Sequence, residues 1–130
     1  MPGRFRLALF FCFIIGLTVL ATRAQTQEVE ITGYYSGDGT FKEGDFVRIT
    51  RSGQVYQYLQ RYPAGDWIGV AIRDGNNLSI AWQRADGANL GVSVFKIEPG
   101  EKGPTLVGGW AAYPGGGIAK DTLKWSRKLD

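Results

Sequence analysis

Residues 67–83 read WIGVAIRDGNNLSIAWQ, and this stretch decides the fold. Residues 67–73 and 78–83 are short runs rich in β-branched and aromatic side chains, which are enriched in strands. Between them, Asp74-Gly75-Asn76-Asn77 is a strong turn signal, because Gly and Asn tolerate the positive φ of a tight hairpin turn. Apolar residues alternate with small or polar ones in the second run. The stretch therefore predicts an antiparallel β-hairpin.

The same pattern continues in both directions from this hairpin. Further apolar runs, separated by turn signals at a spacing of about ten residues, lie at 29–35, 45–51, 55–61, 90–98, 105–112 and 121–129. No stretch after residue 24 combines helical periodicity with caps. An antiparallel meander of this length usually removes its exposed edges by closing on itself. We therefore predict an all-β fold, a meander of about eight strands closed into a small barrel, with a β-sandwich as the alternative.

The first 24 residues have the organisation of a secretory signal peptide. A positively charged start is followed by an uncharged apolar run at 7–20 and then by small residues. Cleavage after Ala24 fits this pattern, and cleavage after Ala21 is an alternative. The apolar run is shorter than the about 20 residues of a spanning helix, so we expect a cleaved signal helix and no stable membrane insertion. The predicted organisation is a signal peptide at 1–24 and one β-barrel domain at 25–130, secreted or periplasmic.

The charge balance changes when the predicted signal peptide is set aside. The chain has 15 Lys and Arg against 12 Asp and Glu, but Arg4, Arg6 and Arg23 precede residue 25 and no acid does. Residues 25–130 therefore carry 12 charges of each sign. The only cysteine, Cys12, also lies in the signal. We expect no nucleic-acid partner, since the basic excess is a targeting feature, and no disulfide in the mature domain.

Composition also removes most catalytic chemistry. The chain contains no histidine, which excludes Ser-His-Asp and Cys-His catalysis, and no cysteine follows residue 24. A carboxylate-based glycan hydrolase remains as an alternative, and it would use acids such as Asp66 and Asp86. Both acids stand beside glycine in contexts that turns use. We therefore predict a protein that is not an enzyme, with no catalytic residues, no metal site and no cofactor.

Aromatic side chains are the one feature with binding potential. The candidate ligand-binding residues are Tyr56, Tyr58, Trp67, Trp82 and Trp110. The interior of an eight-stranded barrel is either filled by side chains or holds one small ligand. Aromatic residues could fill such a core, or they could line an apolar pocket with a few polar groups. Both readings stay open.

Four glycines interrupt the predicted strands, namely Gly69, Gly91, Gly108 and Gly109. Glycine inside a strand often marks a bend or the close approach of another segment. Strongly coiled strands in a small barrel need such positions. We interpret these glycines as sites of barrel curvature, with the approach of a ligand as the alternative.

An ordered series of motifs runs through the domain. It comprises Gly69-Val70-Ala71-Ile72, Asn77-Leu78-Ser79-Ile80-Ala81-Trp82, Gly91-Val92-Ser93-Val94-Phe95-Lys96-Ile97 and Leu106-Val107-Gly108-Gly109-Trp110. The series resembles a module of uncharacterised secreted bacterial proteins with the elements Gly-Val-Gly-Ile, Leu-x-Val, Gly-Val-x-x-Tyr and Leu-x-Gly-x-Trp. Ala71 and Phe95 depart from it conservatively. The general look is similar to avidin- and lipocalin-type (calycin-like) barrels, and the resemblance implies no catalytic residues.

These observations together indicate an exported, non-enzymatic β-barrel module. We expect it to bind a small apolar ligand or a surface partner. The alternative is a purely structural or interaction domain whose barrel is filled.

Overall fold

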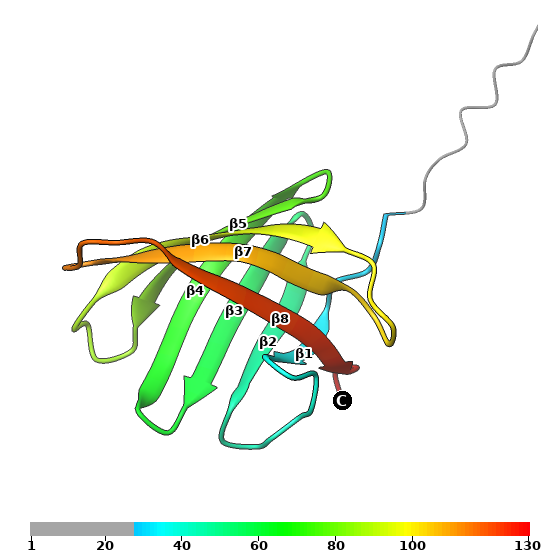
Figure 1. Cartoon of the computed structure of the whole chain (residues 1–130), viewed down its shortest axis with the longest axis horizontal. Helices are drawn as coiled ribbons and strands as arrows, with labels where there is room; N and C mark the ends of the chain where they lie inside the picture. Colours follow the sequence, from blue (N-terminus) through cyan, green and yellow to red (C-terminus); the bar gives the residue numbers. More distant parts are fainter. Residues whose placement is uncertain (1–27) are drawn as a thin grey trace, which may run out of the picture.

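Eight antiparallel strands form a single closed sheet within residues 28–130, the part of the chain that the computed structural model describes (Figure 1). The strands are β1 (Gly33–Ser36), β2 (Phe46–Ser52), β3 (Val55–Tyr62), β4 (Gly65–Asp74), β5 (Asn77–Arg84), β6 (Leu90–Glu98), β7 (Thr105–Tyr113) and β8 (Ala119–Arg127). Each strand pairs with the next along the chain, and β8 pairs with β1. The predicted all-β barrel is confirmed, and the sandwich alternative is wrong. The predicted signal helix and its cleavage site lie outside the described residues.

The tight turns form where the sequence predicts them. Gly53, Gly75 and Gly87 have φ values of 60°, 58° and 77°. L side chains rarely adopt this left-handed conformation, and glycine adopts it without a steric cost. Gly75 closes the hairpin between β4 and β5, whose register pairs Asp74 with Asn77.

The first strand is shorter than predicted and begins at Gly33 instead of Val29. The Glu30 carboxylate accepts hydrogen bonds from the backbone N–H groups of Ile31 at 3.0 Å and Thr32 at 2.9 Å. These donors are therefore engaged locally and do not join a strand ladder. The segment 28–32 instead crosses one end of the barrel.

One end of the barrel is packed solid. Its core takes buried side chains from every strand and from the segment 28–32: Ile31, Tyr35, Val47, Ile49, Tyr56, Tyr58, Ala71, Leu78, Ile80, Phe95, Ile97, Leu106 and Leu123. The Tyr35 hydroxyl donates to the Ile31 carbonyl at 2.6 Å. Arg73 lies behind this segment with its side chain only 4 % exposed, and its Nε is 3.1 Å from the Glu28 carboxylate. The chain entering β1 thus closes this end.

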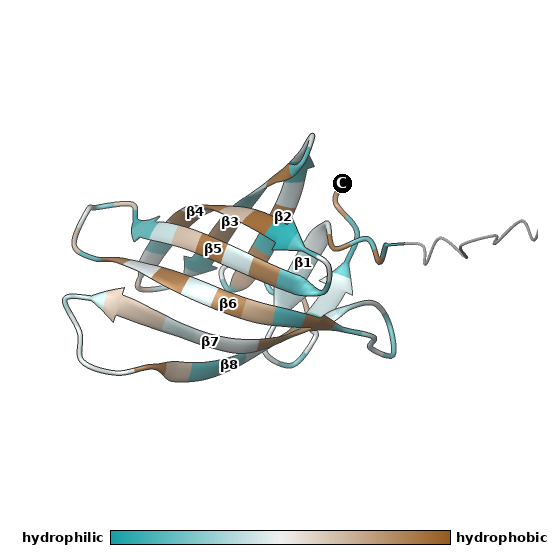
Figure 2. Ribbon diagram, turned by 90° about the horizontal axis from the view of Figure 1, so that it is seen from above, coloured by the Kyte–Doolittle hydropathy of each residue, from teal (hydrophilic) through white to brown (hydrophobic). Residues whose placement is uncertain are grey.

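Along much of β4 and β6 the large apolar side chains point outward and small residues point inward. The large apolar residues of β4 (Ile68, Val70 and Ile72) face the solvent, and so do Leu90, Val92 and Val94 of β6. Gly69, Ala71, Gly91 and Ser93 face the interior. The resulting bands of differing hydropathy are visible along β6 (Figure 2). Small interior residues on these two strands leave room for larger side chains from their neighbours.

Candidate functional site

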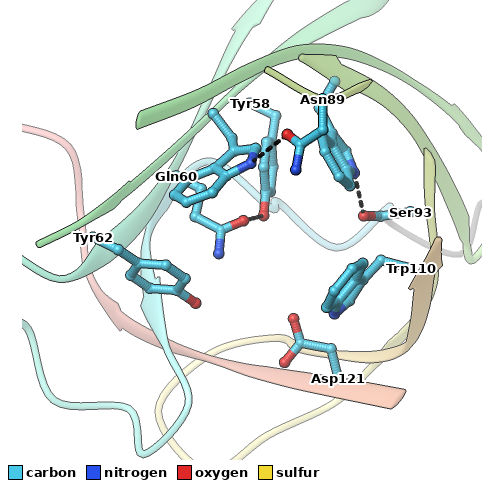
Figure 3. Close-up of a pocket in the computed structure, with 9 residues that line it drawn as sticks. Tyr58, Gln60, Tyr62, Asn89, Ser93, Trp110 and Asp121 are labelled. Atoms are coloured by element: carbon cyan, nitrogen blue, oxygen red, sulfur yellow. Dashed lines mark hydrogen bonds between the residues drawn. The ribbon is translucent and has the colours of Figure 1, made fainter. Parts of the chain in front are cut away.

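A cavity of about 250 Å³ lies inside the barrel at the end opposite the segment 28–32 (Figure 3). It is lined by Tyr58, Gln60, Tyr62, Trp67, Trp82, Asn89, Ser93, Trp110 and Asp121. These residues come from β3, β4, β5, β6, β7 and β8 and from the connection between β5 and β6. The cavity is therefore a property of the closed barrel and not of one loop.

The strand register explains how the barrel holds large rings and still keeps this space. Trp82 pairs with Gly69 on one side and with Gly91 on the other. A Cβ placed on Gly69 would lie 2.9 Å from the Trp82 Cβ, and one on Gly91 would overlap the Trp82 ring. Tyr58 also pairs with Gly69. The glycines therefore provide the space in which an indole lies flat against the wall.

Gly108 shows a second kind of close approach. A Cβ there would collide with the Val94 carbonyl and lie 2.9 Å from the Phe95 Cα. The atoms that an added Cβ would meet at each of the three glycines belong to the protein's own chain. At Gly69, Gly91 and Gly108 the close approach is therefore made by the barrel itself.

Hydrogen bonds fix the polar edges of the aromatic walls. The Trp82 Nε1–H donates to the Ser93 hydroxyl at 2.9 Å. The Trp67 Nε1–H donates to the Asn89 side-chain oxygen at 3.3 Å. Both bonds are drawn in Figure 3. Because the donors are satisfied by the protein, the rings are held in place before anything binds.

The phenol and ring contacts complete this wall. The Tyr58 hydroxyl donates to the Gln60 side-chain oxygen at 2.7 Å. Trp82 and Trp110 meet edge to face with centroids 6.3 Å apart, and Tyr62 meets Trp67 in the same way at 6.0 Å. Such pairs contribute about 0.5–1.5 kcal/mol beyond their buried area. Aromatic surface therefore surrounds the cavity on several sides.

Within residues 28–130, Asp121 is the only charged side chain that lines the cavity. Its carboxylate points into the same space as the Tyr62 hydroxyl (Figure 3). Burial raises the pKa of Asp121 above its ordinary value, and a hydrogen bond from the Thr122 backbone N–H offsets part of that rise. Burial is also the main cause of the raised pKa values of Tyr58 and Tyr62, and the Asp121 charge adds to both. The cavity is thus a partly desolvated site with a negative group in it.

Four of the five predicted ligand-binding residues meet at this cavity. Tyr58, Trp67, Trp82 and Trp110 line it, whereas Tyr56 does not. Tyr56 is buried in the core, and the Arg51 guanidinium lies 5.4 Å from the centroid of its ring. Tyr58, two residues further along β3, also belongs to the core, but unlike Tyr56 it lines the cavity as well.

Five of the lining residues were not among the predicted ones: Gln60, Tyr62, Asn89, Ser93 and Asp121. A period-two signal for Asp121 is present in the sequence, because it stands two residues before Leu123 and four before Trp125, on the same face of the strand. Asn89 gave no such signal, since it lies in a connection. Asn89 is held by the hydrogen bond from the Arg84 N–H to its carbonyl and by the bond from Trp67 to its side chain.

The two acids of the hydrolase alternative do not line this cavity. Asp66 is held by Arg61 through two hydrogen bonds of 3.2 and 3.1 Å, and this contact lowers the pKa of Asp66. Asp86 forms an ion pair with Arg84 at 3.0 Å and accepts a hydrogen bond from the Ala88 N–H. Each carboxylate has a separate arginine partner, so the structure gives no support to their pairing across a substrate.

Across residues 28–130 the chain has no group of three or more Asp, Glu, His or Cys side chains placed to hold a metal ion. None of its segments here is a helix of the length and apolar character needed to cross a membrane.

No family model, no curated protein and no solved structure matches this chain.

Proposed function

We propose that this protein is an exported, non-enzymatic binding protein that holds a small molecule in the aromatic cavity. The observation that carries the proposal is the cavity of about 250 Å³, lined by five aromatic rings with a few polar groups among them. Binding sites for small molecules have this composition, mainly apolar walls with sparse polar groups that orient the guest. Export follows from residues 1–24 as a sequence-based prediction.

Preorganisation supports binding over a purely structural role. The indole N–H groups of Trp67 and Trp82 are already bonded to Asn89 and Ser93, so the walls need little rearrangement to accept a guest. A fully filled barrel would leave no such space at one end while the other end is tightly packed. The absence of histidine from the whole sequence supports a role in binding over one in catalysis.

The test is a binding screen on the purified protein. Native mass spectrometry detects a co-purified guest, and isothermal titration calorimetry measures binding of neutral, cationic and anionic small molecules. We expect at least one class to bind, and the Trp110→Ala variant to bind it more weakly. Val94→Ala, which trims an exposed side chain on the outer surface, is the matched control and should bind as the wild type does. Binding that Trp110→Ala leaves unchanged, or no binding by any class, would overturn the proposal.

A further inference from the structure

The charge inside the cavity has no counterion of its own. Among the described residues no Lys or Arg forms an ion pair with Asp121, whereas Asp66 and Asp86 each have an arginine within 3.1 Å. No basic side chain lines the cavity either. A partly buried carboxylate without an ion-pair partner loses part of its hydration, and no nearby positive charge compensates for that loss. Such a group is therefore placed to meet a positive charge that arrives from outside.

The aromatic walls favour the same sign of charge. The face of an aromatic ring carries the negative side of its quadrupole and attracts a cation that sits over it. The N–H edges of Trp67 and Trp82 and the hydroxyl of Tyr58 point to protein acceptors and are already bonded. What these three rings leave toward the space is mainly ring surface. An anion placed there would meet the Asp121 carboxylate.

We propose that the cavity binds a small organic ammonium ion, whose charge is balanced by Asp121 and whose alkyl groups pack against Trp82, Trp110 and Tyr62. This inference rests on the proposed binding function and names its ligand class. An ammonium ion with methyl groups matches both parts of the site, because its charge is spread over an apolar surface. Aromatic cages are a general means of recognising such cations.

The size of the cavity limits the ligand. At about 250 Å³ it is smaller than the about 300–1,000 Å³ of sites for drug-sized ligands. Trp110 is 38 % exposed and so lies at the mouth. A compact ammonium head fits inside, with any longer substituent directed past Trp110 toward solvent.

The test compares three molecules of one shape and different charge. Choline carries a trimethylammonium group, 3,3-dimethylbutan-1-ol replaces its nitrogen by carbon and is neutral, and 3,3-dimethylbutanoate is an anion. Binding of each to the purified protein is measured by isothermal titration calorimetry at low ionic strength and pH 7. A cation held by a carboxylate and aromatic faces should bind at least about tenfold more tightly than the neutral analogue. The anion should bind most weakly of the three.

The variant Asp121→Asn separates charge from shape. It keeps the size of the side chain and an oxygen that can accept from Thr122. We expect it to lose about tenfold in affinity for choline while binding the neutral alcohol as the wild type does. Asp74→Asn is the matched control, because it removes the same charge from an exposed residue at the end of β4, on the opposite end of the barrel, and should leave all three affinities unchanged.

The outcomes distinguish this inference from the proposed function. If the neutral alcohol binds as tightly as choline, or if Asp121→Asn binds choline normally, the ammonium inference is overturned and the binding function stands. If choline and the two analogues all fail to bind, the ammonium inference is also overturned. If no molecule of any charge binds in the wider screen, the proposed function fails with it.

Discussion

Asp121 and Leu123 stand two residues apart on β8 and face the same interior, yet they have opposite effects on the fold. Leu123 is 2 % exposed and packs in the core, where burial of an apolar side chain stabilises the folded state. Asp121 is partly buried with its pKa raised, so its ionised form is less favourable in the folded protein than in the unfolded chain. At neutral pH this residue costs stability, which a cationic ligand would restore.

Asp121→Asn should therefore raise the free energy of unfolding at pH 7. The folded pKa of Asp121 lies above its ordinary value of 3.8, so the folded protein binds the proton more tightly than the unfolded chain. The resulting cost is absent well below pH 3.8, grows as pH rises through the interval between the two pKa values and is complete above it.

Urea unfolding at about pH 3.5, just below the ordinary pKa of a carboxyl group, and at about pH 7, well above it, measures this difference. The gain of the variant over the wild type should be larger at pH 7. Tyr58 and Tyr62, the titratable groups on β3 that sense the Asp121 charge, have raised pKa values and stay neutral throughout this range. A variant that is less stable than the wild type at pH 7 would show that burial of this carboxylate is not a cost.

Gly91 is a residue at which a single methyl group should disturb both the fold and the cavity. Gly91→Ala would drive its Cβ into the Trp82 ring and the Ala111 carbonyl. We expect a loss of about 1–3 kcal/mol in unfolding free energy, the usual cost of overpacking. Displacement of Trp82 should also weaken ligand binding.

Gly116→Ala provides the comparison for this substitution, because a Cβ at Gly116 has no neighbour within 4 Å. Its effect on stability should stay within about 1 kcal/mol. Thermal or urea unfolding of the two variants measures the difference. Equal stability of the two would contradict the role assigned to Gly91.

Individual strands run from the packed end of the barrel to the cavity. β7 shows this change from core to cavity along its length. Leu106 is fully buried at the packed end, while Trp110 is 38 % exposed at the cavity. Leu106→Ala should cost about 2–5 kcal/mol, as expected for a large-to-small change in a core. The substitution should have little effect on ligand affinity, because Leu106 lies away from the cavity lining.

Trp110→Ala should show the reverse pattern. Its cost in stability should be near the about 0.5–1.5 kcal/mol of a lost aromatic pair, and its effect on binding should be large. Parallel urea titrations and calorimetry on the two β7 variants test this division. If Leu106→Ala abolished binding while remaining folded, the separation between a packed end and a binding end would be wrong.

The strands and turns could be predicted from the sequence because each signal is local. Gly75 in its turn and the alternation from Leu78 to Trp82 depend on neighbours in the chain. The start of β1 could not be predicted, since the Glu30 carboxylate takes the N–H groups that a strand would use. β-Propensity at Val29 and Ile31 carries no information about that competition.

The candidate site was only partly predictable for a different reason. Both faces of β4 and β6 are apolar or small, so alternation cannot say that Val70 points outward and Gly69 inward. That direction is set by the rings of Tyr58 and Trp82 on the neighbouring strands, which occupy the space beside Gly69. The aromatic lining was therefore predictable as a set of residue types. Asp121 had a period-two signal, since it shares a strand face with Leu123 and Trp125, whereas Asn89 lies in a connection where alternation gives no direction.

On the scale of the whole molecule, the segment 28–32 is part of the barrel although it belongs to no strand. Ile31 is fully buried and accepts the hydrogen bond of Tyr35. Ile31→Ala should lower the free energy of unfolding by about 2–5 kcal/mol, whereas Val29→Ala, at a side chain 45 % exposed, should change it by less than about 0.5 kcal/mol. Chemical denaturation measures both. Equal, small effects would mean that this segment does not close the core.

The entry of this segment also sets the orientation of the barrel toward anything attached to it. Glu28 meets Arg73 at the packed end, and the C-terminal Asp130 lies on the same side of the molecule, away from the connections between β5 and β6 and between β7 and β8 (Figure 1). A tether attached near Glu28 or at Asp130 would hold the barrel by its packed end. On a sensor surface or a bead, the mouth of the cavity would then face the liquid and remain open to exchange.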